Sequence, residues 1–443
     1  MKQVSAFEKF AYSVGAFGQN MVYGLMSTYL MIFYTDNFGI SAAAVGTLFL
    51  VARIWDAVMD PVIGIIVDRF NSKWGKLRPF ILVGGTLSGI LTIACFFNPD
   101  LGITGKMVYA YITYIVWGTT YGLMDVPYWS MSSTMTLDPD ERTKIVSIPK
   151  LTGILGAVLV TVVTIPMVTA FGHGDNARGY FFTALIIGLI CAMGAIFTAA
   201  KTKERTNVPK KEHEKFSKSI NVVAKNVPLI IILLSTLFTN ISFFIKQTVQ
   251  TYYFTYIYGD VSKVSVFSFI GILPMILAML FAAPFSKKVG KKNAAITVAF
   301  VSAVFCGAMY YCTNSLVLLT VFNSISMAGI GAMLVFTISM QADTVEYAEW
   351  KTGKRSESII FSMGTFTTKL SSAIGGAFVG YWLSVMGYIP DAAQPPKVLS
   401  GINIMMSWAP AIGLLLMGII LMFYNLTEKR HAEILEALKE RQY

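Results

Sequence analysis

Charged residues are scarce in this chain. Asp, Glu, Lys and Arg make up 13% of its 443 residues and hydrophobic residues 55%, whereas soluble domains carry roughly 25% charged residues. A soluble fold has too little interior to bury so much apolar surface. The apolar residues also come in blocks of about 20, the length of a helix that crosses a bilayer. The sequence therefore predicts an all-α membrane protein surrounded by lipid.

Histidine and cysteine are rarer still, with three and four copies. The histidines fall in loops or the tail, and the cysteines lie in apolar segments without metal-ligand or disulfide spacing. The chain has no Walker loop and no H-E-x-x-H motif. These absences argue against an enzyme, a resident metal and an organic cofactor. The net charge of +11 does not indicate a nucleic-acid partner, because the basic residues lie in short segments between apolar blocks.

Apolar runs between clusters of charge predict twelve spans. They cover approximately residues 10–34, 42–67, 80–97, 107–131, 145–168, 181–200, 227–253, 264–285, 294–312, 315–342, 357–386 and 402–425. Twelve spans put both termini on one side of the membrane. The segments on that side, counted with Lys150 near the start of the fifth span, hold 28 Lys and Arg residues, and those on the other side hold four. The positive-inside rule then predicts cytoplasmic termini for a protein of the cell (inner) membrane.

A basic, mostly polar stretch divides these spans into six and six. The predicted organisation is an N-terminal six-helix bundle at 1–200, a cytoplasmic linker at 201–226, a C-terminal six-helix bundle at 227–425 and a cytoplasmic tail at 426–443. Two related six-helix halves around a midplane site are the architecture of the major facilitator superfamily.

The loop after span two resembles the signature loop of that superfamily. It contains Asp68, Arg69 and Arg78, and the resemblance implies that these residues latch neighbouring helix ends in one of the alternating states. A solvated basic turn that only sets topology explains the same residues. Both interpretations stay open.

Span two carries three ionisable residues on one helix face. Arg53 precedes Asp56 by three residues, and Asp60 follows Asp56 by four. Two carboxylates one turn apart repel unless a cation or a proton lies between them, and Arg53 neutralises only part of that charge. The pattern predicts a cation site for H+ or Na+ at Asp56 and Asp60. An internal salt-bridge cluster is the alternative.

Span four places Tyr121, Asp125 and Trp129 on successive turns. A carboxylate accepts hydrogen bonds from sugar hydroxyls, and an indole face packs against the apolar face of a pyranose. Trp129 alone would indicate an interfacial anchor. Asp125 beside it favours a sugar site.

Other spans contribute further polar residues. Gln19 and Asn20 in span one either bind the substrate or hold helices together. Lys246 in span seven and Lys369 in span eleven each need a carboxylate, a carbonyl or water, although Lys246 could instead extend to the outer surface. Together these residues describe a small polar cavity. The main alternative, a carrier of a lysolipid, drug or other amphiphile on the same scaffold, needs a wide apolar cavity.

At this point the sequence resembles the glycoside-pentoside-hexuronide:cation symporters, a melibiose permease-like family. The matching stretches, spread over almost the whole chain, are 12–18, 34–36, 46–57, 74–76, 124–130 and 342–347. The resemblance implies a cation bound by Asp56 and Asp60, a sugar bound near Asp125 and Trp129, and Lys369 closing the network from the other half.

Departures from the family pattern bear on the substrate. Asn20 and Gln19 stand where the galactoside branch has an acidic residue preceded by a basic one, and Lys150 stands where the family's sugar site has an arginine. Gly122 replaces a hydroxyl-bearing residue of the cation site, which favours protons over sodium. We therefore expect cation-coupled symport of a hexuronide (glucuronide) or a pentoside rather than a galactoside, by alternating access.

Overall fold

A computed structural model of the protein describes residues 4–70, 72–136, 139–205, 226–353, 357–390 and 392–442. Within these ranges all regular structure is helical. The chain forms two compact units. Unit 1 holds Met1–Lys210, Gly259–Ser268 and Gly380–Gln394, and unit 2 holds Lys211–Tyr258, Phe269–Val379 and Pro395–Tyr443. The predicted linker at 201–226 falls mostly outside the described residues, so the division into the four predicted segments stays a prediction.

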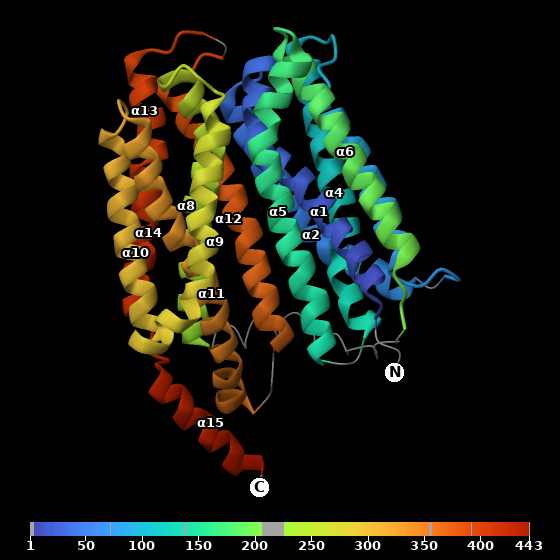
Figure 1. The fold of residues 1–443 in the computed structure, drawn as a ribbon, viewed down its shortest axis with the longest axis vertical. Helices are drawn as coiled ribbons and strands as arrows, with labels where there is room; N and C mark the ends of the chain where they lie inside the picture. The colour runs from blue at the N-terminus through green and yellow to red at the C-terminus, as the bar shows by residue number, and fades with distance from the viewer. Residues whose placement is uncertain are drawn as a thin grey trace. The chain divides into compact units, whose positions relative to one another are not determined.

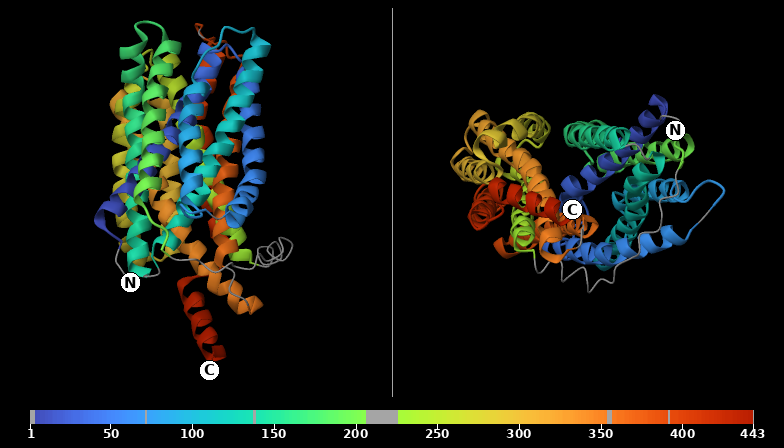
Figure 2. Two further views of the ribbon diagram at one scale, coloured as in Figure 1. Left: turned by 90° about the vertical axis from the view of Figure 1, so that its right-hand side faces the viewer. Right: turned by 90° about the horizontal axis from the view of Figure 1, so that it is seen from below.

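Unit 1 contains six long helices, which Figure 1 draws in blue to green. They are α1 (Ala6–Ile32, continued by η1, Phe33–Asn37), α2 (Ala42–Arg69), α3 (Arg78–Cys95), α4 (Ile103–Met135), α5 (Pro139–Gly172) and α6 (Asn176–Lys201). Helix α1 packs against α5 and α6, and α3 packs against α4 and α6. Figure 2 shows these helices running side by side. Serine side chains begin α1 and α2, because Ser5 and Ser41 each accept a hydrogen bond from an otherwise unsatisfied backbone N–H.

Unit 2 contains the remaining helices. They are α8 (Val227–Tyr252, continued by η2, Tyr253–Ile257), α9 (Lys263–Val289), α10 (Lys291–Ala308, continued by η3, Met309–Tyr311), α11 (Leu316–Thr352), α12 (Glu357–Met386), α13 (Pro396–Met406), α14 (Trp408–Met422) and α15 (Glu428–Gln442). Two of these helices belong to unit 2 only in part: α9 from Phe269 onward and α12 up to Val379. Helices α13 and α14 are one span broken at Ser407, where φ is −121° and ψ is −75°. Pro410 explains the break, because it has no N–H for the carbonyl of Met406 and its ring clashes with that carbonyl.

The helix lengths agree with the predicted membrane fold. Eight described helices are each long and apolar enough to cross a bilayer. Helix α2 is not among them, although its 28 residues suffice for a crossing, and it carries the ionisable residues Arg53, Asp56 and Asp60. With α13 and α14 counted as one broken span, the described helices of at least 18 residues give twelve. The prediction of an all-helical, twelve-span fold is therefore confirmed.

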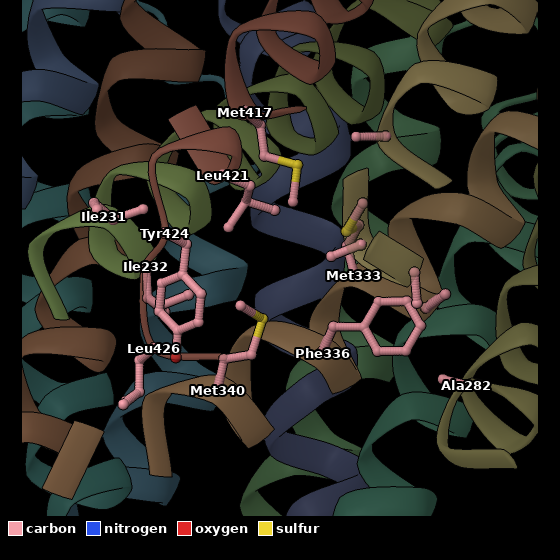
Figure 3. Close-up of a cluster of buried hydrophobic side chains, with 14 of the residues drawn as sticks. Ile231, Ile232, Ala282, Met333, Phe336, Met340, Met417, Leu421, Tyr424 and Leu426 are labelled. Carbon is pink, nitrogen blue, oxygen red and sulfur yellow. The ribbon is translucent and has the colours of Figure 1, made fainter. Parts of the chain in front are cut away.

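An apolar core joins several helices of unit 2 (Figure 3). Met417 and Leu421 of α14 lie with Phe336 and Met340 of α11 in this buried cluster. The same cluster includes Ile434 of α15. The last helix is thus anchored to its unit by the buried Ile434 side chain and by a hydrogen bond from the Lys291 backbone N–H to the Glu428 carboxylate.

The loop after α2 folds back on unit 1. Glu204, just after α6, accepts hydrogen bonds from the backbone N–H groups of residues 76–78 at the start of α3. Arg78 in turn donates from Nε to the carbonyl of Ala199 at the end of α6, at 2.6 Å. Each charge faces the helix end of opposite partial charge. Gly75 permits this approach, because its φ is +105° and a Cβ there would clash with Glu204 Oε1.

Candidate functional site

A reciprocal tyrosine pair fixes α1 against α4. The Tyr12 hydroxyl donates to the Tyr128 carbonyl at 2.5 Å, and the Tyr128 hydroxyl donates to the Tyr12 carbonyl. Their rings are stacked, with centroids 4.3 Å apart, and both side chains are fully buried. Two buried hydrogen bonds and an aromatic stack hold the relative register of these helices. The residues of each helix within two turns of the pair are therefore held in a defined relation.

Those residues include the predicted sugar site. Gln19 of α1 donates from Nε2 to Oδ1 of Asp125 on α4 at 2.6 Å. Trp129 donates from its indole nitrogen to the same carboxylate oxygen at 3.0 Å. Asp125 and Trp129 are partly exposed, whereas Gln19 is buried. The structure thus brings together three of the predicted substrate-binding residues in unit 1.

An aromatic wall adjoins this group. The rings of Tyr23 on α1 and Tyr121 on α4 lie 5.6 Å apart, and the ring of Tyr121 lies 5.3 Å from that of Trp117. The guanidinium of Arg53 on α2 lies 5.8 Å from the centre of the Tyr23 ring. Tyr121, another predicted substrate residue, therefore lies between the sugar-site residues and the ionisable residues of α2.

The ionisable residues of α2 face two glycines of α4. Arg53 Nη1 bonds Asp56 Oδ2 at 2.9 Å, and Asp56 is 7% exposed. A Cβ added at Gly118 would lie 2.6 Å from Asp56 Oδ1, and one added at Gly122 would lie 3.1 Å from Asp60 Oδ1. Both predicted cation-site carboxylates therefore pack against the backbone of α4, with only a hydrogen atom between.

One face of α4 serves both groups. Gly118, Gly122, Asp125 and Trp129 follow each other at intervals of four, three and four residues, the spacing of neighbours on one helix face. The rise from Gly122 to Asp125 is only about 4.5 Å. The predicted cation and sugar sites are thus adjacent along a single helix.

Other predicted residues of unit 1 have different surroundings. Asn20 donates to the carbonyl of Ala16, one turn earlier in α1, at 2.9 Å, and its amide lies against Gly153 of α5. Lys150 on α5 and Arg69 at the end of α2 are exposed. The side chain of Asp68 lies outside the described residues.

The two predicted lysines of the second half belong to unit 2. Lys246 is 4% exposed, and its Nζ lies 3.5 Å from Ser326 Oγ of α11 and 4.0 Å from Met309 Sδ. Lys246 therefore points into the interior of unit 2 rather than along α8 to its end. Lys369 lies half-buried on α12.

The sequence did not predict that the Asp56 and Asp60 carboxylates pack against Gly118 and Gly122. Gly118 was not singled out, and Gly122 was considered only as a position where the family has a hydroxyl. The available signal was a pair of small residues four apart on α4, matching the four-residue spacing of the two carboxylates on α2. Sequence reasoning also missed Glu204 as the partner of the signature loop, because 128 residues separate Glu204 from Lys76 in the sequence.

Known proteins are similar over nearly the whole chain. A family model described as MFS/sugar transport protein matches residues 11–428. The isoprimeverose transporter of Lactiplantibacillus pentosus is 34% identical over 98% of this chain and 91% of its own length. The glucuronide carrier protein homolog of Escherichia coli is 30% identical over 97% and 94%. Among solved structures, the inward-open xylose transporter XylE of E. coli has the same fold, with a TM-score of 0.66 at 13% identity over 97% of this chain and 98% of that one.

Proposed function

Because the chain belongs to the MFS/sugar transport protein family, we propose that it moves a sugar or glycoside together with a monovalent cation by alternating access. The expected kinship with the glycoside-pentoside-hexuronide:cation symporters is confirmed. The protein is accordingly a multi-pass membrane transporter and not an enzyme. From the distribution of basic residues we propose that both termini are cytoplasmic.

The shared face of α4 carries the proposal. A cation or proton at Asp56 and Asp60 offsets the repulsion between these carboxylates and favours close packing of α2 on Gly118 and Gly122. Asp125 lies one turn further on the same helix, so the position of α4 affects both ligands. Each ligand then raises the affinity for the other by the same factor, as thermodynamic linkage requires.

We favour a proton over sodium as the coupling ion. Hard metal cations prefer several oxygen ligands, and the residue beside Asp60 on α4 is Gly122, which offers no side-chain oxygen. A proton needs only one carboxylate oxygen. Arg53 is bonded to Asp56 at 2.9 Å, so this ion pair already belongs to the proposed proton site.

The remaining assignments are proposed on the same basis. Substrate binding is assigned to Gln19, Asn20, Tyr121, Asp125, Trp129, Lys150, Lys246 and Lys369, and coupling or gating to Arg53, Asp68, Arg69 and Arg78. The relatives named for isoprimeverose and for glucuronide support a pentoside or a hexuronide as the cargo.

Uptake into proteoliposomes tests the proposal. Radiolabelled glycosides, pentosides and uronides are offered under an imposed proton or sodium gradient. We expect accumulation driven by one gradient, and we expect Asp56→Asn and Asp60→Asn to abolish accumulation while equilibrium exchange persists, because only the cation site is lost. Asp100→Asn, at an exposed carboxylate in the loop before α4, is the matched control. Full accumulation by either cation-site variant would refute the assignment.

A further inference from the structure

We propose that Trp55 of α2 is a positioning residue for the proposed cation site and that it acts through a hydrogen bond to Thr119 of α4. The inference rests on the proposed function and extends the cation site beyond its two carboxylates. Trp55 immediately precedes Asp56 in the chain, and Thr119 immediately follows Gly118. The bond therefore lies beside the contact between Asp56 and Gly118.

The bond joins an indole to a hydroxyl whose own proton is already used. Trp55 Nε1 donates to Thr119 Oγ1 at 2.9 Å. The Thr119 hydroxyl donates in turn to the carbonyl of Ile115, one turn earlier in α4, at 3.0 Å. An indole N–H only donates, and the hydroxyl oxygen keeps lone pairs to accept it. Trp55 is 44% exposed, so its ring lies at the edge of the contact between α2 and α4.

The two helices run in the same direction. The carboxylate of Asp56 faces Gly118 and that of Asp60 faces Gly122, so the contacts advance by four residues along both chains. Successive residues of an α-helix are about 100° apart around its axis. On parallel helices, the residue before Asp56 and the residue after Gly118 therefore lie on the same side of the contact. The indole bond closes that side.

The contact between carboxylates and glycines does not by itself fix the rotation of α2. A glycine has no side chain that could interlock with the ridges of a neighbouring helix. The ion pair of Arg53 with Asp56 lies within α2 and does not join α2 to α4. A second hydrogen bond between the helices, from the Tyr111 hydroxyl to the Ala44 carbonyl, lies about three turns from Asp56. The indole bond constrains α2 at the level of the carboxylates.

A small rotation of α2 is enough to disturb the cation site. A carboxylate about 5 Å from the helix axis moves by about 0.9 Å when the helix turns by about 10°, and binding sites tolerate roughly 0.5 Å. The bonds from Gln19 and Trp129 to Asp125 lie on α1 and α4 and do not involve α2. Loss of the indole bond should therefore weaken cation binding and leave the sugar site in place.

Two substitutions remove the bond from opposite ends. Trp55→Phe removes the donor and keeps an aromatic ring, and Thr119→Val removes the acceptor and keeps the shape of the side chain. Accumulation of radiolabelled methyl xyloside and methyl glucuronide by the full-length carrier in proteoliposomes is measured against the concentration of the coupling cation. We expect either substitution to raise the half-maximal cation concentration at least about threefold, which for protons is a shift of about half a pH unit towards acid. Equilibrium exchange at saturating cation should change less than about twofold.

Further variants separate positioning from general structural support. Thr119→Ser keeps the hydroxyl and should restore the cation dependence of the unmodified carrier. The double variant should show the shift of one single variant and not the product of both, because the two substitutions remove the same bond. Thr92→Val is the matched control. It removes the acceptor of another indole bond, donated by Trp117 of α4 to Thr92 of α3 at 3.0 Å, and should leave the cation dependence unchanged.

The outcomes distinguish this inference from the proposed function. If one single variant does not fold, the other decides. An unchanged half-maximal cation concentration in a folded Trp55→Phe or Thr119→Val carrier would overturn the inference and leave the proposed symport intact. An equal shift in Thr119→Ser or in Thr92→Val would do the same. Failure of the unmodified carrier to accumulate either sugar would count against the symport function, and with it against this role for Trp55.

Discussion

Replacement of Gly118 by alanine would test how closely the α2 carboxylates must approach α4. The added Cβ would lie 2.6 Å from Asp56 Oδ1, whereas a Cβ at Gly122 would lie 3.1 Å from Asp60 Oδ1. Relaxing each contact to 3.4 Å moves the Asp56 carboxylate by about 0.8 Å and the Asp60 carboxylate by about 0.3 Å. Binding sites tolerate displacements of roughly 0.5 Å. The two substitutions therefore fall on opposite sides of that limit.

The Asp56 carboxylate also cannot move away from an added Cβ at Gly118 without breaking another contact. Its other carboxylate oxygen is held by Arg53 at 2.9 Å, so a shift of the carboxylate disturbs the ion pair as well. Because a displacement of about 1 Å can cost roughly a hundredfold in a positioned site, we expect Gly118→Ala to lower gradient-driven accumulation at least about tenfold. Gly122→Ala should have a much smaller effect. Alanine exceeds glycine in helix propensity by about 1 kcal/mol, so neither change should unfold α4 by itself.

The assay compares accumulation with exchange in proteoliposomes. Gly118→Ala should lose accumulation and retain counterflow, because the proposed sugar site at Asp125, two turns away, is intact. Thermal stability in detergent checks that both variants are folded. Wild-type accumulation by Gly118→Ala, or equal losses in both variants, would refute the argument that the approach of α2 to α4 forms the cation site.

Three further predictions concern single residues. Trp129→Ala should weaken binding of the cognate sugar at least about tenfold, since the stacking face is lost, and unchanged affinity in a monodisperse variant would make Trp129 an interfacial anchor. Lys246→Ala should abolish uptake by a uronide carrier but leave uptake of an uncharged glycoside largely intact, which parallel uptake assays with the two substrates would decide. Burial raises the pKa of Glu141, but hydrogen bonds from Val4 and Lys9 outweigh this effect and lower it below the ordinary 4.5. The resulting stabilisation is present above pH 4.5 and is lost as the pH falls through the lowered pKa, so Glu141→Gln should flatten the acid side of a thermal-stability profile.

Local periodicity was enough to predict much of the fold. The apolar run at 357–386 coincides with α12, because lipid-crossing length and flanking charge define such a helix by themselves. The span predicted at 315–342 ends ten residues too early, because α11 continues through polar residues to Thr352. Gly353 ends the helix by adopting a left-handed conformation. The break at Ser407 was also missed, although Pro410 was a visible signal for it.

The candidate site was predictable along each helix but not between helices. The four-residue spacing of Asp125 and Trp129 placed them on one face, and they are hydrogen-bonded to each other. The bond from Gln19 to Asp125 joins positions 106 residues apart, and its existence depends on how α1 rotates against α4. Lys246 shows the same limit, because its direction follows from the packing of α8 on α11 and not from the sequence around it.

The placement of Gln19 on α1 has a consequence for how such a carrier can diversify. Helix α4 carries the two glycines that face the α2 carboxylates, Gly118 and Gly122, and also Asp125 and Trp129. A mutation on α4 could therefore impair both the proposed cation site and the proposed sugar site. Helix α1 places Gln19 on the carboxylate of the proposed sugar site, but it contributes neither of the glycines that face the α2 carboxylates. Substitutions on α1 could therefore change the substrate specificity during evolution while the proposed cation site on α2 and α4 stays the same.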